Sequence, residues 1–475
     1  MNIIIVGCGR IGSTLVEELS GENHDISIID EKAHVVQKLA ETHDVLGVIG
    51  NGASYSILSD AGVETADIII AVTNSDELNL LCCLIAKKAG RCETVARVRN
   101  PVYYDEISFI KEEMGISVVL NPELSAAYEI ARLLRFPSAM EVNKFSKGRI
   151  EMLKYRIPHN SKLDGMTLID VSNQLNCEIL ISAVERKKEL IIPNGSFQLR
   201  EKDIISFVGR PNCAMEFFRK IGERKNQVHE AMIIGGSKIG FYLSKLLVSS
   251  GIGVKLIDKD RDQCERLNES IPDAMIIHGN GNDHDMLLEE GLTDVDAFIA
   301  LTNHDEENMF LSLYAQSQSD AKLVTKVQKL NYDAMIERLD LGSMIYPEYL
   351  TAQYIIQYVR ARQNSIGSNI ENLYKLMDGR AEALEFHIQK GSPVIGRPIK
   401  DLSLIDNLLI CSIYRKGKPM IPNGQDHMEE DDLVVVVTTK KGITRCQRHL
   451  KERIMGAGYN EFFNDSIRNR FGNAL

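Results

Sequence analysis

The sequence of 475 residues predicts an α/β protein made by tandem duplication, in which a Rossmann-like domain with a doubly wound parallel sheet precedes a small α+β domain and the pair is then repeated. Three observations predict this fold. A glycine turn with GxGxxG spacing follows the first apolar run, short apolar runs then alternate with helical segments, and the pattern returns at an offset of 225 to 231 residues. Strands that alternate with helices form parallel sheets. The length suits about three or four domains better than one core.

The first strand and its glycine turn begin the chain. The run NIIIV at residues 2–6 is β-branched and apolar, as in a strand that is buried on both faces. Gly7, Gly9 and Gly12 follow and open a helix whose free N–H groups can hold a pyrophosphate. Asp30 ends the second strand, 23 residues after Gly7, near the spacing at which a carboxylate accepts ribose hydroxyls. The alternative is a glycine turn kept for packing, with Asp30 as a helix N-cap.

Alternating strands and helices complete a first domain, which we predict at residues 1–122. The strands are expected at 2–6, 25–29, 45–49, 66–72, 94–98 and 117–120, and the helices between them at 32–42, 54–61, 76–89 and 102–113. A doubly wound sheet binds its ligand at the carboxyl ends of the strands, where the strand order reverses. The glycine turn, Gly50-Asn51-Gly52 and Thr73-Asn74 should meet there, with small and amide side chains that can line a nucleotide.

A small domain is predicted at residues 140–224, after an amphipathic helix at 123–136 that Pro137 closes. Its sequence alternates, with Met152, Lys154 and Arg156 on one face of a strand and Leu153, Tyr155 and Ile157 on the other. The residues at 193–195, Pro-Asn-Gly, are typical of a turn. We therefore expect a small α+β domain with its own core.

The repeat predicts a second Rossmann-like domain at 228–348 and a second small domain at 369–453. GGSKIG repeats GCGRIG, Asp258 lies 23 residues after Gly235, and IPNG stands at both 192 and 421. A helix at 349–361 repeats the amphipathic helix, and its apolar face should pack against a neighbouring module. The copies differ at three positions of the crevice: Ser237 replaces Gly9, Lys326 replaces Arg97 and Gln328 replaces Arg99. We expect two unequal sites, in the second of which the serine hydroxyl could donate to a phosphate oxygen.

Composition excludes several classes of protein. The net charge of -11 and the pI near 5.6 argue against a nucleic-acid partner, which requires a basic surface. No apolar run approaches the roughly 20 residues that span a bilayer, so we expect no membrane span. The N-terminus lacks the features of a secretory signal. Nine cysteines without a CxxC pair indicate free thiols in a reducing cytosol.

Other polar groups have less specific interpretations. His24, His34 and His43 are expected to face solvent, and the segment HGNGNDHD at 278–285 could bind a divalent ion, although its counterpart GNGASYSI has no such ligands. Asp76-Glu77 and Asp305-Glu306 follow strand ends, where helix capping is favoured over an ion or subunit contact. Arg97 and Arg99 point to one face of their strand. A phosphate contact and a charge pair across a subunit interface are two equally favoured roles for them.

With these residues in view, the chain resembles the TrkA family, the regulatory subunits of bacterial Trk potassium-uptake systems, which carry two RCK (regulator of potassium conductance) modules. The resemblance rests on GCGRIG with Asp30, on GNG, on VTNSDE at 72–77 and on VARVRN at 95–100, together with the repeat. It covers residues 1 to about 453. Residues 454–475 lie beyond it and are expected to form a polar tail.

The resemblance implies binding of NAD or NADH, with ADP or ATP as further candidates, at two sets of residues. The first set is Gly7, Cys8, Gly9, Arg10, Ile11, Gly12, Asp30, Asn51, Thr73, Asn74 and Arg97. The second set is Gly235, Gly236, Ser237, Lys238, Ile239, Asp258, Asn280, Thr302, Asn303 and Lys326.

The resemblance also implies a peripheral position on the cytoplasmic, inner face of the plasma membrane. The implied partners are a membrane-embedded potassium translocation subunit and further copies of the chain, in a dimer or tetramer ring. We expect a regulatory protein without catalytic residues or a metal site. The alternatives are an NAD-dependent oxidoreductase and a structural nucleotide-binding scaffold.

Overall fold

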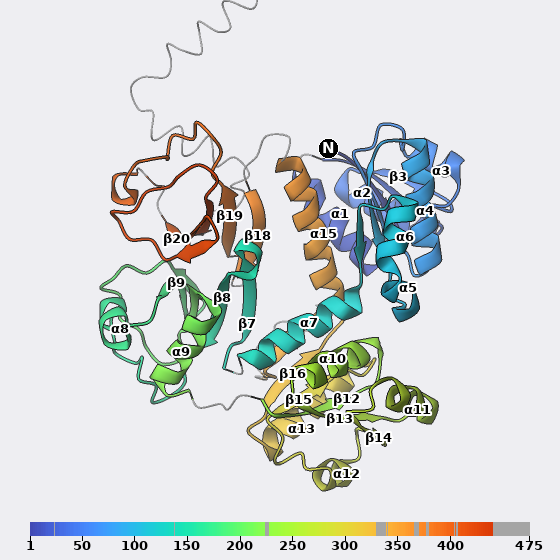
Figure 1. The fold of residues 1–475 in the computed structure, drawn as a ribbon. Helices are drawn as coiled ribbons and strands as arrows, with labels where there is room; N and C mark the ends of the chain where they lie inside the picture. The colour runs from blue at the N-terminus through green and yellow to red at the C-terminus, as the bar shows by residue number, and fades with distance from the viewer. Residues whose placement is uncertain are drawn as a thin grey trace, which may run out of the picture. The chain divides into compact units, whose positions relative to one another are not determined.

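The computed structural model describes residues 1–439 except for 23, 137, 224–227, 329–338, 340, 365–369, 377–379, 403, 405 and 406. The predicted tail at 454–475 and the last part of the second small domain, 440–453, lie outside the described residues. The chain divides into two compact units (Figure 1). The first unit comprises residues 1–138 and 225–359, and the second comprises residues 139–224 and the chain from 360 onward.

The first Rossmann-like domain, in the first unit, has a parallel six-stranded sheet in the order β3-β2-β1-β4-β5-β6. Every strand lies within two residues of its predicted position. The predicted helix at 102–113 is instead two helices, α5 and α6. The elements are β1 (Asn2–Val6), α1 (Arg10–Leu19), β2 (Asp25–Asp30), α2 (Ala33–His43), β3 (Leu46–Ile49), α3 (Tyr55–Asp60), β4 (Ile68–Ala71), α4 (Asp76–Ala89), β5 (Glu93–Arg97), α5 (Pro101–Asp105), α6 (Ile107–Met114) and β6 (Val118–Leu120).

The second Rossmann-like domain repeats this sheet in the order β14-β13-β12-β15-β16-β17. In both sheets the strand order reverses beside the first strand, which places a crevice between the carboxyl ends of the first and fourth strands. The elements are β12 (Glu230–Ile234), α10 (Lys238–Ser249), β13 (Gly253–Asp258), α11 (Arg261–Ser270), β14 (Met275–His278), α12 (His284–Glu289), β15 (Ala297–Ala300), α13 (Asp305–Gln318), β16 (Lys322–Lys326) and β17 (Ser343–Ile345).

Two connector helices, α7 (Pro122–Arg135) and α15 (Pro347–Asn364), are exchanged between these domains. Helix α7 follows the first sheet in sequence but packs on α10 of the second domain, and Asn121 Nδ2 at its N-cap donates to the hydroxyl of Tyr242 at 3.0 Å. Helix α15 lies beside α1 of the first domain (Figure 1), and its Ile355 and Val359 belong to the core cluster that contains Leu15 of α1. The prediction that the helix at 349–361 packs against a neighbouring module is therefore confirmed.

The second unit contains two antiparallel five-stranded sheets, in the orders β10-β9-β11-β8-β7 and β18-β19-β22-β20-β21. The first carries two helices, α8 and α9, and aromatic side chains of α9 pack on Phe207. The elements are β7 (Glu141–Phe145), β8 (Ile150–Arg156), α8 (Leu168–Leu175), β9 (Ile179–Arg186), β10 (Glu189–Ile191), β11 (Ile204–Gly209), α9 (Pro211–Ile221), β18 (Ile370–Leu376), β19 (Ala381–His387), β20 (Leu408–Arg415), β21 (Lys418–Met420) and β22 (Leu433–Thr438).

The two small sheets share a core cluster, so, contrary to the prediction, the first does not fold around a core that is wholly its own. Met152, predicted on a polar face, is 2% exposed and packs in a cluster with Ala383 and Val435 of the second sheet. Ser146 also donates its N–H and its hydroxyl to the buried carboxylate of Glu385, at 2.6 and 2.8 Å. Both faces of the first sheet are therefore covered, one by α9 and the other by the repeat.

Three further predictions from the sequence concern His24, the cysteines and membrane-spanning helices. His24 does not face solvent as predicted, because its side chain is fully buried. The eight cysteines of the described part are unpaired thiols, and burial raises the pKa of Cys82 to about 12. Among the residues that the structure describes, no helix has the length and hydropathy to cross a bilayer.

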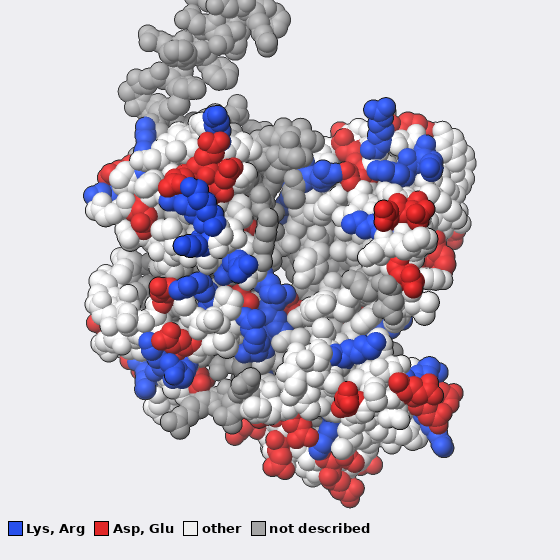
Figure 2. All heavy atoms as spheres, in the orientation of Figure 1, with Lys and Arg blue, Asp and Glu red and all other residues white. Residues whose placement is uncertain are grey.

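Charges of both signs are dispersed over the face in view (Figure 2). Acidic side chains gather around α12, where Asp283, Asp285 and Glu289 are exposed.

The exchange of α15 generates a prediction for stability. Ile355→Ala removes a fully buried side chain from the core beneath α1 and should lower the free energy of unfolding of the first Rossmann-like domain by about 2 to 5 kcal/mol. The matched change in the other connector, Tyr128→Ala, removes a half-exposed ring and should cost less than about 1 kcal/mol. Scanning calorimetry of both variants measures the difference. Equal losses would show that α15 does not stabilise the first domain.

Candidate functional site

The first glycine turn is built from three glycines with different constraints. Gly7 has φ +97°, and a Cβ there would lie 2.8 Å from the backbone N of Thr73. A Cβ on Gly12 would lie 2.0 Å from the carbonyl oxygen of Gly7. At Gly9, by contrast, a Cβ would meet no described heavy atom within 4 Å beyond its chain neighbours. Gly7 and Gly12 are thus required by the fold, and Gly9 faces open space at the N-terminus of α1.

The acid at the end of the second strand holds the glycine turn. Asp30 accepts the N–H of Cys8 at 2.8 Å and that of Lys32 at 2.9 Å, and Asp258 accepts the N–H of Gly236 at 2.6 Å. The N-cap of α2 is Lys32, so the alternative of Asp30 as the N-cap is wrong. A carboxylate has about four lone-pair sites, so each acid can still accept ribose hydroxyls.

The loop after the fourth strand of each sheet is fixed by a buried asparagine that the sequence analysis missed. Asn79 is fully buried, accepts the N–H and the hydroxyl of Thr73 at 2.8 and 2.7 Å, and donates to the carbonyl of Arg97. Asn308 likewise accepts the N–H of Thr302 at 2.8 Å and donates to the carbonyl of Lys326 at 3.0 Å. The signal was present, since an asparagine recurs at the same helical position of both copies.

The cations at the end of the fifth strand brace the same loops. Arg97, 8% exposed, donates to the carbonyl of Thr73 at 3.2 Å, and Arg99 donates to that of Asn74 at 2.6 Å. Lys326 donates to Leu301 at 3.2 Å in the second copy, where burial lowers the pKa of its ammonium group. These bonds join the end of the fifth strand to the loop after the fourth strand and so hold that loop in place.

The capping role predicted for Asp76 is wrong. Ser75 caps α4, accepting the N–H of Leu78, whereas Asp76 accepts the N–H groups of Arg99 and Asn100 at 2.9 and 2.8 Å. Asp305 similarly accepts the N–H of Gln328 at 3.0 Å. These acids tie the loop after the fifth strand to the start of the next helix.

Charged groups link the two crevices within the first unit. Arg10, at the start of α1, donates to Gln328 at 2.8 Å and pairs with Glu348 of α15 at 3.1 Å. At the matching place of the other copy, Glu123 of α7 lies in the field of Lys238 and Arg97. Burial nevertheless raises the pKa of Glu123, and its Oε2 has no hydrogen-bond partner among the described residues.

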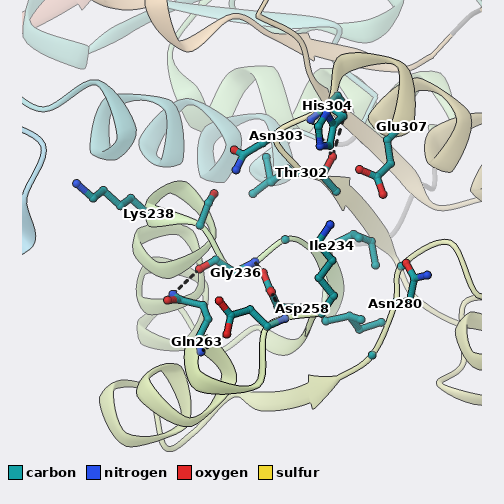
Figure 3. A pocket seen from close by; sticks show the side chains of 18 residues that line it. Ile234, Gly236, Lys238, Asp258, Gln263, Asn280, Thr302, Asn303, His304 and Glu307 are labelled. Carbon is teal, nitrogen blue, oxygen red and sulfur yellow. Dashed lines mark hydrogen bonds between the residues drawn. The ribbon is translucent and has the colours of Figure 1, made fainter. Parts of the chain in front are cut away.

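The second crevice is a cleft of about 490 Å³ (Figure 3). The predicted residues Gly235, Gly236, Ser237, Lys238, Asp258, Asn280, Thr302 and Asn303 all line it. Five further polar side chains that sequence reasoning missed also line it: Lys259, Asp260, Gln263, His304 and Glu307.

Some predicted side chains cannot face a ligand. Ile11, Ile239 and Cys8 are buried, so only their backbone groups are offered, and burial raises the pKa of the Cys8 thiol to about 12. The Ser237 hydroxyl is buried without a hydrogen-bond partner in the described part of the chain, so the donation to phosphate suggested above would require it to turn.

The histidine-rich segment at 278–285 has structural roles. Asp283 caps α12 by accepting the N–H of Met286 at 3.2 Å, and the ring of His284 stacks on Tyr314 with centroids 3.8 Å apart. The described residues contain no group of three His, Cys, Asp or Glu side chains arranged to hold a metal ion.

Comparison with known proteins follows the same division of the chain. The TrkA-N domain model matches residues 3–122 and 231–347, and the TrkA-C domain model matches residues 152–222 and 383–451. The chain belongs to the TrkA family. It carries two tandem RCK modules, each with a TrkA-N and a TrkA-C domain, as the resemblance implied.

Relatives match over almost their whole length. A Trk system potassium uptake protein TrkA homolog of Archaeoglobus fulgidus is 31% identical over 436 residues, covering 92% of this chain and 97% of the relative. The Trk system potassium uptake protein TrkA of Haemophilus influenzae is 30% identical over 460 residues, covering 94% and 98%.

Solved structures share the fold of this TrkA-family chain. The GsuK RCK domain superposes with a TM-score of 0.59 at 17% identity, covering 95% of both chains. The GsuK channel bound to NAD has a TM-score of 0.58 at 18% identity, covering 95% of this chain and 79% of that one.

The buried carboxylate of Glu123 generates a pH-dependent prediction. Because its pKa is raised in the folded state, the folded protein holds that proton more tightly than the unfolded chain, and stability is lost as pH rises through the unfolded pKa toward the folded one. Glu123→Gln mimics the protonated form. It should therefore raise the free energy of unfolding by about 1 kcal/mol near pH 7.5, with no gain near pH 4.

Thermal unfolding across this pH range measures the effect. Glu113→Gln, at an exposed position of α6, is the matched control and should change little at any pH. A lower melting temperature of Glu123→Gln at pH 7.5 would show that attraction to Lys238 and Arg97 outweighs the cost of burial.

Proposed function

We propose that this chain is a peripheral, cytoplasmic regulatory subunit that binds NAD or NADH and gates a membrane-embedded potassium-uptake transporter. The observation that carries the proposal is the placement of each connector helix against the glycine-turn helix of the other Rossmann-like domain. The proposed domains are 1–122, 140–224, 228–348 and 369–453. The names of the relatives, potassium uptake proteins, support the transport role.

In the first crevice the nucleotide would lie along three loops. Its pyrophosphate would accept backbone N–H groups at the start of α1, next to the open space at Gly9. Asp30 would accept the ribose hydroxyls, while Asn51, Thr73 and Asn74 would line the remainder. The GsuK channel, which has the same fold, has been solved with NAD bound, and this supports the choice of ligand.

Regulation would follow from contacts that join the crevices to the connectors. A phosphate on α1 would compete with Glu348 for the guanidinium group of Arg10, and Glu348 lies in the first turn of α15. A ligand that binds one arrangement of α1 and α15 better than another shifts their populations. Such coupling is typically worth about 1 to 3 kcal/mol. Self-association of the chain in a dimer or tetramer ring would pass this shift to the translocation subunit.

The competing proposal is an NAD-dependent oxidoreductase, which would need an acid or base beside the nicotinamide. We expect no steady consumption of NADH with a panel of 2-oxo acids and aldehydes. Turnover that is lost in Gly9→Leu would establish the oxidoreductase instead.

Asp30 provides the binding test. Asp30→Ala should weaken NADH binding at the first crevice by at least about tenfold, because it removes charge-assisted hydrogen bonds to ribose worth roughly 1.5 to 3 kcal/mol. It should also narrow the preference for NADH over NADPH, since the carboxylate repels a 2′-phosphate. Calorimetric titration measures both effects, with Asp258→Ala as the matched change in the second crevice. An unchanged first-site affinity would reduce Asp30 to a support for the glycine turn.

Transport provides the functional test. The chain and its membrane partner should restore potassium uptake to transport-deficient cells, and Asp30→Ala or Gly9→Leu should change the rate without lowering the amount of either protein. Uptake that is independent of the chain and of both substitutions would contradict the regulatory role.

A further inference from the structure

One wall of the crevice differs in chemical character between the two copies. In the first copy, Ala53 and Leu78 are apolar and pack against the core of their domain. Their counterparts are Asn282 and Glu307, and Asn282 Nδ2 donates to Glu307 Oε1 at 2.6 Å. An apolar wall has thus become an amide–carboxylate pair.

The glycine turn and Asp258 show which part of a bound nucleotide would face this pair in the second cleft. The pyrophosphate of a bound nucleotide would lie at the glycine turn and the start of α10, and its ribose would lie at Asp258. The base would therefore occupy the part of the cleft that is lined by the loops after β14 and β15. Figure 3 shows Lys238 and Gln263 on one side of the cleft and Glu307 with Asn280 on the other. Glu307 lines the cleft where the base would lie.

The hydrogen bonding of the pair defines what it can recognise. The Asn282 amide group donates to Glu307, which leaves the second carboxylate oxygen and the Asn282 carbonyl oxygen as acceptors. A ligand group that faces them must donate. The 6-amino group of adenine carries two N–H donors, whereas hypoxanthine has a carbonyl oxygen at that position, which a carboxylate repels.

We propose that Glu307, held by Asn282, makes the second crevice selective for the 6-amino group of adenine, in ADP or in the adenine half of NAD. The first crevice, with Ala53 and Leu78 in these places, does not discriminate in this way. This inference rests on the proposed nucleotide binding and deepens it, because it assigns a base preference to one crevice only.

The experiment measures the second crevice in a chain whose first crevice is blocked. Gly9→Leu fills open space at the first glycine turn, and a thermal melt checks that the variant folds. Titrations with ADP against IDP, and with NADH against its hypoxanthine analogue, then report the base preference of the second crevice for each ligand class. We expect each adenine ligand to bind at least tenfold more tightly than its hypoxanthine counterpart.

Two substitutions at Glu307 separate recognition from folding. Glu307→Leu recreates the residue of the first copy and should reduce the preference to less than about threefold, mainly by weakening the adenine ligands. Glu307→Gln keeps the shape and adds a donor, so it should shift the preference toward the hypoxanthine ligands. The reciprocal pair Ala53→Asn and Leu78→Glu, in an Asp258→Ala background, should introduce an adenine preference in the first crevice.

Each contrary outcome has a distinct meaning. Equal binding of adenine and hypoxanthine ligands in the Gly9→Leu chain, or a preference that survives Glu307→Leu, overturns the inference and leaves the proposed function in place. Failure of the second crevice to bind any of these nucleotides while the first binds NADH also overturns it. If neither crevice of the wild-type chain binds nucleotide, the proposed function fails together with the inference.

Discussion

The first unit depends on the exchange of its connector helices. Helix α1 does not complete its core within its own domain, because Ile355 and Val359 of α15 belong to the same cluster as Leu15. Helix α10 is covered by α7, and the Asn121–Tyr242 bond fixes their contact. Since α1 and α10 are the helices that begin at the glycine turns, the elements nearest a bound phosphate are also those that hold the two domains together.

The charges between the crevices follow from this exchange. It brings the first turn of each connector to the glycine turn of the other domain, so that Arg10 meets Glu348 and Lys238 lies near Glu123. Asn79 and Asn308 fix the loop after the fourth strand in the first and second crevice, respectively. The loop after the fourth strand of each sheet is therefore held by internal hydrogen bonds, whereas the half-exposed Arg10–Glu348 pair is accessible to an anionic ligand.

Most of the fold could be predicted from the sequence because its elements are locally encoded. Glycine spacing, β-branched runs and the repeat predicted both parallel sheets and eight of the residues that line the second cleft. The errors arose where a distant segment decides the outcome. Met152 sits in an alternating strand, yet the second small sheet covers its face. Asp76 has the position of a helix cap, but the backbone after the fifth strand takes its carboxylate. Glu307 was missed because only the folded cleft brings it to the crevice.

Fusion of the two modules in one polypeptide has a consequence for how the crevices can evolve. In a homodimer every mutation changes both equivalent sites at once. In the duplicated chain a mutation changes only one of the two crevices. Two such differences are Ser237, the counterpart of Gly9, and Glu307, the counterpart of Leu78. In a homodimer each of these substitutions would be present in both subunits. The covalent tether also makes the association of the paired domains intramolecular, at an effective concentration that dilution cannot lower. A duplicated chain can thus specialise one half while the other keeps the ancestral chemistry.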